Sequence, residues 1–89
     1  MHKEYEIEEY TAIEEQIHYY CKCLLVSHPD QIIKYLEKRL EKYAETLQYA
    51  HLYPDTVILP LQQLVIEYSL DVARIRKYMN LKRKIKYII

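Results

Sequence analysis

Four side chains near the first proline are of the types that bind zinc. His18 and Cys21 are three residues apart and share one face of a helix, whereas Cys23 points nearly the opposite way from Cys21. His28 is the fourth of these side chains. The four residues contain neither a C-x2-C pair nor an H-x3–5-H pair, the spacings that zinc sites use. We therefore expect no metal site and no cofactor, with the two cysteines acting as small hydrophobic residues.

Catalytic constellations are equally weak. Ser27 beside His28 is explained by helix capping together with Asp30, so it does not require a nucleophile and base. Glu14 and Glu15 are adjacent and do not face a common pocket. The chain also contains no Gly, which excludes the Gly-rich phosphate loops of nucleotide-binding proteins. We expect a protein that is not an enzyme and has no small-molecule substrate.

An aromatic and basic stripe is the first candidate for a binding surface. It follows the second helical segment, beside that segment's line of Leu residues. Tyr and Arg are enriched at protein interfaces, so the stripe predicts a dimer contact. The alternative is that these Tyr side chains pack over the rim of the protein's own core. The interface candidates are Tyr35, Arg39, Lys42, Tyr49 and Tyr53.

The basic C-terminal segment is the second candidate. On a continuous helix its polar and basic side chains fall on one face, where Lys and Arg would bind phosphates and Tyr87 would stack on a base. The alternative is a solvated face that complements the negative end of the helix dipole. The nucleic-acid candidates are Arg76, Lys77, Asn80, Arg83, Lys84 and Tyr87.

The two ends of the chain carry opposite charges, which the formal net charge of zero conceals. Residues 1–30 contain two Lys against seven acidic residues, and residues 61–89 contain seven basic residues against two acidic ones. If the ends meet within one molecule, each surface pair contributes little to stability. If they meet between molecules, they orient self-association. Both arrangements remain open.

Helical periodicity predicts three helices, near residues 11–26, 28–52 and 60–79, with the prolines at their boundaries. Pro60 suits the first position of the third helix, so the stretch 55–59 is predicted to be an extended connector. Val65, Ile66 and Leu70 widen the apolar stripe of the third helix, which is therefore expected to be the most buried. Residues 1–10 and 80–89 fit either a helix or a short strand.

These segments predict an all-α protein, a single domain over residues 1–89 built as an antiparallel three-helix bundle. The acidic N-terminus does not match a secretion signal, and the longest apolar stretches are far too short to span a bilayer. We expect a cytoplasmic protein with no membrane contact.

The composition points to a family as well. The chain has no Gly, a single Asn and 11 Tyr, with abundant Ile, Lys and Glu. In this it resembles the small orphan helical proteins of viruses that infect hyperthermophilic archaea, without sharing a motif with them. The resemblance implies a thermostable dimer acting on DNA or on other proteins. Our functional hypothesis is a protein–protein interaction module that self-associates as a homodimer; the alternative is a nucleic-acid-binding protein using the basic face.

Overall fold

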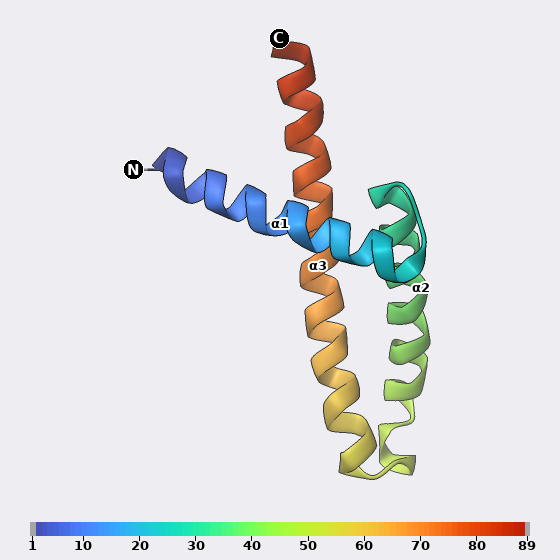
Figure 1. Cartoon of the computed structure of the whole chain (residues 1–89). Coiled ribbons are helices and arrows are strands. Elements are labelled where there is room, and N and C mark those ends of the chain that lie inside the picture. Colours follow the sequence, from blue (N-terminus) through green and yellow to red (C-terminus); the bar gives the residue numbers. More distant parts are fainter. Residues whose placement is uncertain (1, 89) are drawn as a thin grey trace.

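The computed structural model describes the backbone of residues 2–88 and the side chains of residues 9–83 (Figure 1). Three helices and a short 3-10 turn make up this part of the chain, which confirms the all-α prediction. They are α1 (His2–Leu24), α2 (Pro29–Gln48), η1 (Ala50–Leu52) and α3 (Asp55–Ile88). Because residues 2–88 contain no strand, the strand alternatives for the two ends are not supported.

The helices form a hairpin crossed by a third helix. α2 and α3 lie side by side and run in opposite directions, joined through η1 at the lower end of Figure 1. α1 crosses α3 steeply and does not run along it. The three helices pack on one another, but the predicted bundle of three antiparallel helices is not confirmed. One side of the α2–α3 hairpin is therefore covered only where α1 crosses it.

α1 is longer than predicted at one end and shorter at the other. It begins at His2 and not at residue 11, which confirms the helical alternative for this part of the chain, and Tyr10 packs on Tyr78 with the ring centroids 4.8 Å apart. It ends at Leu24, because Leu25 adopts φ 56°, in the left-handed region that Gly normally occupies. The N–H of Val26 then bonds to the carbonyl oxygen of Cys21 at 3.1 Å, which completes a Schellman cap without Gly.

α2 starts with an unexpected cap. His28 is the N-cap residue and Pro29 occupies the first turn. The Oε1 atom of Gln31 accepts hydrogen bonds from the backbone N–H groups of Ser27 and His28, at 3.0 and 3.1 Å. The prediction that Ser27 and Asp30 form the cap is wrong, because the longer Gln side chain reaches back to both orphan donors. The helix also ends at Gln48, before a 3-10 turn, and not at residue 52.

α3 starts five residues before the predicted position. The carbonyl oxygen of Pro54 accepts hydrogen bonds from the N–H groups of Val57 and Ile58, at 3.0 and 3.2 Å, so the helix has already formed there. Pro60 consequently lies inside the helix, and the prediction of an extended connector over 55–59 is wrong. Ile58, in the first turn of this early start, is buried, and burial of its apolar side chain stabilises the helical arrangement.

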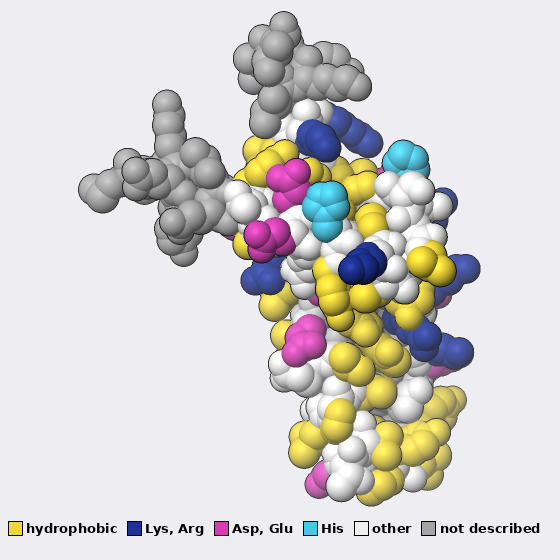
Figure 2. Space-filling view, viewed as in Figure 1, with side chains coloured by type: hydrophobic (Ala, Val, Ile, Leu, Met, Phe, Trp, Pro, Cys, Tyr) yellow, Lys and Arg dark blue, Asp and Glu magenta, His cyan; other side chains and the backbone are white. Residues whose placement is uncertain are grey.

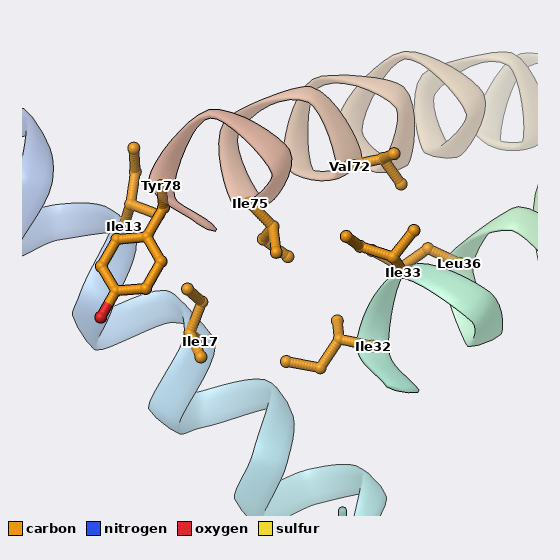
Figure 3. Close-up of a cluster of buried hydrophobic side chains, with 8 residues drawn as sticks. All are labelled: Ile13, Ile17, Ile32, Ile33, Leu36, Val72, Ile75 and Tyr78. Carbon is orange, nitrogen blue, oxygen red and sulfur yellow. The ribbon is translucent and has the colours of Figure 1, made fainter. Parts of the chain in front are cut away.

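The core lies where the three helices meet (Figure 3). Ile and Leu side chains from α2 and α3 face one another, and two Ile residues of α1 close the cluster from one end. Ile32, Leu36 and Ile75 are the most completely buried. The cluster consists of Ile13, Ile17, Ile32, Ile33, Leu36, Val72, Ile75 and Tyr78.

Candidate functional site

Helix α3 carries apolar side chains on two opposite sides. One side packs on α2 and α1 through residues such as Val72 and Ile75. The other follows spacings of seven and four residues, which keeps it on one line about half a turn away from the core. It consists of Leu59, Ile66 and Leu70, which we call the outer face of α3; these side chains are 62%, 55% and 49% exposed.

Among the described side chains α3 contributes more buried residues than α1 or α2, as expected, but its buried stripe is narrower than predicted. Ile66 and Leu70 do not widen the buried stripe; they lie in solvent. The physical reason is that α2 and α1 both pack on the core side of α3, and α1 contacts residues of that side such as Asp71 and Tyr78. A helix that is apolar on two sides usually packs against a neighbour on each.

A second exposed apolar region lies where α2 turns into α3. We call Tyr49, Leu52, Tyr53 and Val57 the hairpin end; all four are exposed, with Leu52 at 68%. Figure 2 shows hydrophobic side chains gathered over this lower end of the molecule. Leu59 of the outer face follows Val57 by two residues on α3, so the two apolar regions are close in the chain, although these two side chains point to different sides of the helix.

The predicted tyrosine stripe divides into two parts. Tyr35 is half-buried against the core, and its hydroxyl accepts a hydrogen bond from Arg39 Nε at 3.2 Å while the guanidinium lies 5.3 Å from the ring centroid. Lys42 is exposed, beside this pair on α2. Tyr49 and Tyr53 belong to the hairpin end. The upper part of the stripe thus serves the protein's own packing, and the lower part is exposed.

The basic residues of α3 do not share a single free face. Arg76 Nη2 lies 2.7 Å from Glu37 Oε1 on α2, and Lys77 Nζ lies 3.7 Å from Glu9 Oε1 on α1. The second pair brings the acidic N-terminal and basic C-terminal segments together within one molecule. α3 is continuous, as the hypothesis required, but the side chains of Lys84 and Tyr87 lie outside the described residues.

Three of the nucleic-acid candidates line a shallow cleft. Its volume is about 470 Å³, and it lies between the first half of α2 and the C-terminal half of α3. Arg76, Asn80 and Arg83 line it from α3, and Lys34 lines it from α2. Two acidic residues, Asp30 and Glu37, share the same walls. The cleft is therefore of mixed sign.

Three of the four His and Cys side chains considered as zinc ligands line a wider groove between α1, the first loop and α3. The groove has a volume of about 890 Å³, and its lining includes His18, Cys21 and His28. Cys23 is exposed and is not part of the lining. Among the side chains of residues 9–83, no three His, Cys, Asp or Glu residues are placed to hold a metal ion. The apolar floor includes Ile17, and Lys82 and Arg83 stand on the α3 wall.

A buried polar pair holds α1 against α3, and no sequence pattern indicated it. The Tyr20 hydroxyl donates a hydrogen bond to the carboxylate of Asp71, which is only 7% exposed. Burial, followed by this hydrogen bond, raises the pKa of Tyr20. Nothing in local spacing relates residues 51 positions apart. The outer face of α3, by contrast, could have been found from the seven-residue spacing of Leu59 and Ile66.

Comparisons with known proteins give no relative from which a role could be transferred. No protein-family model matches the sequence, and neither curated proteins nor solved structures give a match. The compositional resemblance to viral proteins consequently stays a prediction. Within the described part of the chain, none of the helices combines the length and the apolarity that crossing a membrane requires.

Proposed function

We propose that this protein is an interaction module that works by self-association, with the outer face of α3 and the hairpin end as its contact surface. The observation that carries the proposal is the second apolar line on α3, Leu59, Ile66 and Leu70, whose side chains stay about half exposed or more in the described part of the chain. Large apolar side chains grouped in this way mark interaction surfaces more often than single exposed ones do.

The surface area of the chain supports a partner. The chain exposes 7521 Å², whereas a compact monomer of 10.9 kDa exposes about 5,600 Å². The excess of about 1,900 Å² reflects an elongated chain, and the outer face of α3 and the hairpin end are part of its exposed surface. The radius of gyration, 16.0 Å against about 12 Å for a compact chain of this length, leads to the same conclusion.

A second copy of the chain is the partner that fits this surface best. The exposed side chains of the outer face are all aliphatic, so the surface is complementary to itself. Two-fold dimers use such self-complementary patches. Tyr49 and Tyr53 supply the aromatic contacts that interfaces favour, which keeps the lower part of the predicted tyrosine stripe within the contact.

The mass of the protein in solution tests the proposal. At micromolar concentration and moderate salt we expect a dimer. Ile66→Glu would raise its dissociation constant by about 100-fold or more, because a charge would have to be buried at the contact. Ala44→Glu, an exposed site on α2 away from the core, is the matched control and should leave the dimer intact. A wild-type protein that stays monomeric up to ~100 µM would overturn the proposal. Its dissociation constant would then be at least about a hundred times that of a typical micromolar dimer.

Nucleic-acid binding is the second candidate, favoured by one observation: Lys34, Arg76, Asn80 and Arg83 line a common cleft. Binding through phosphate contacts would be measurable at ~50 mM salt and would weaken as salt increases. Replacing Arg76 and Arg83 together by Ala would reduce the slope of log affinity against log salt concentration by about two, because two phosphate contacts would be lost. Absence of binding to duplex or single-stranded DNA and RNA at ~50 mM salt would remove this candidate.

A further inference from the structure

We propose that two copies pair through their α3 helices in an antiparallel orientation, with Leu59 of one copy opposite Leu70 of the other. This inference rests on the proposed self-association and adds the orientation and register of the contact. It concerns the outer face of α3, whose three apolar residues are at least 49% exposed.

The extent of the apolar line determines the register. Leu59 and Leu70 are the two ends of the line, about 16 Å apart along a helix. Antiparallel helices bury both ends completely only if each Leu59 lies opposite the other copy's Leu70. The two-fold axis then passes between Gln63 and Ile66, and each Ile66 packs beside Gln63 of the second copy. Such alternating seven-and-four spacing is the pattern that lets two helices interlock.

The charges at the two ends of the outer face favour the antiparallel orientation. Asp55 lies one turn before Leu59, near the same edge of α3 as Arg76. In the proposed register Asp55 comes to the level of residue 74 of the second copy, within one turn of Arg76 and Lys77. Both cations remain more than half exposed despite their ion pairs, at 58% and 62%.

A parallel arrangement would have the opposite effect. It would align Lys77 with Lys77 along the contact line and Asp55 with Asp55 at its start. Like charges placed together across an interface cost binding energy, whereas opposite charges orient the partners. The parallel dimer buries the same three apolar residues, so charge is what distinguishes the two orientations.

Disulfide cross-linking tests the orientation directly. Single Cys variants would be made in a Cys21→Ala, Cys23→Ser background that is first verified by circular dichroism and mass. Mixed Leu59→Cys and Leu70→Cys proteins should form a heterodisulfide under mild oxidation, since a disulfide requires Cα atoms closer than ~7 Å. Leu59→Cys alone should not cross-link. The expected rate exceeds that of an exposed control, Glu45→Cys on α2, by ~100-fold, because the effective concentration within a dimer is millimolar.

The possible results separate the orientation from the proposed function. A mixed 59–70 cross-link in a dimeric protein supports both. Rapid cross-linking of Leu59→Cys to itself overturns the antiparallel orientation but leaves self-association standing. A dimer in which neither pair cross-links faster than Glu45→Cys places the contact elsewhere and overturns the inference. A monomeric background protein that is as helical as the wild type overturns both.

Discussion

The Tyr20 hydroxyl donates a hydrogen bond of 2.5 Å, Oη to Oδ2, to the carboxylate of Asp71, linking the C-terminal part of α1 to the middle of α3. Asp71 is buried among apolar residues of the helix crossing, where an unpaired carboxylate would be costly. The bond is directional, so it selects one position of α1 along α3, whereas the surrounding Ile contacts would tolerate sliding. It explains how a short hydrophobic cluster can hold a steep crossing in place.

Loss of the Tyr20 hydroxyl should therefore destabilise the fold. Tyr20→Phe keeps the ring but leaves Asp71 without this donor, and we expect a loss of about 1.5–3 kcal/mol in the free energy of unfolding. Urea denaturation followed by circular dichroism measures it. Tyr53→Phe, on the exposed hairpin end, is the control and should change stability by less than ~0.5 kcal/mol. Equal effects of the two substitutions would contradict the role of this pair.

Stability should fall at alkaline pH in a way that depends on Tyr20. Burial and the hydrogen bond to Asp71 raise its pKa above the ordinary value of 10.0. Above pH ~10 the unfolded chain loses the phenolic proton while the folded chain keeps it, so stability declines as pH rises, by up to about 1.4 kcal/mol per pH unit from this group. Below pH ~10 the contribution is fully present.

Denaturation curves between pH ~9 and ~11.5, on either side of the ordinary tyrosine pKa, measure this decline. Tyr20→Phe should show a shallower decline than the wild type. Tyr10 and Tyr68, whose pKa values are also raised, by hydrogen bonding to Tyr78 and by burial respectively, contribute equally in both proteins. Parallel pH profiles for the wild type and Tyr20→Phe would show that Tyr20 ionises normally in the fold.

Leu25→Gly should stabilise the protein. Leu25 has φ 56° and its side chain is 91% exposed, so the substitution relieves left-handed strain without removing packing. A left-handed conformation costs a non-Gly residue about 1–2 kcal/mol, and the added freedom of Gly in the unfolded chain offsets about 0.4–1 kcal/mol. The net expected gain is roughly 0.5–1 kcal/mol by thermal or urea denaturation. Lys22→Gly, inside α1, should instead lower stability by about 1 kcal/mol.

Pro60→Ala should also stabilise the protein, and it discriminates between two positions for the start of α3. Pro60 lies inside the helix, where it removes a backbone donor that Ala would restore. Ala also makes the unfolded chain more flexible, which offsets part of this effect. We expect the free energy of unfolding to rise by about 1–2 kcal/mol. If α3 instead began at Pro60, the same substitution would remove a favoured first-turn residue and lower stability.

Several features of the fold could be read from local patterns because their causes are local. Apolar spacing of three and four residues identified the helices, and Pro29 located the start of α2 within one residue. The boundaries that failed depend on contacts elsewhere. α3 extends back to Asp55, and this turn buries Ile58; the local conformational preferences around Pro60 do not reveal the free energy gained by that burial.

The candidate surfaces also combine features that the sequence spacing predicts with features that depend on tertiary contacts. The tyrosine stripe was recognisable from spacing, but only the structure separates Tyr35, engaged with Arg39, from the exposed Tyr53. Lys77 belongs to the predicted basic face, but in the structure it pairs with Glu9 across the helix crossing. Ile66 and Leu70 were recognisable as apolar, but only the structure shows that α1 and α2 pack on the other side of α3 and leave about half of each side chain exposed.

The sequence by itself determined that the chain is helical, that α2 begins beside Pro29 and that the two ends of the chain carry opposite charge, since periodicity, proline and charge act over a few residues. Only the tertiary structure decided which apolar line of α3 became core and which became surface, and that Tyr20 meets Asp71. Those outcomes depend on the angle at which α1 crosses the hairpin, which is set by side-chain packing between distant segments and leaves no periodic trace in the sequence.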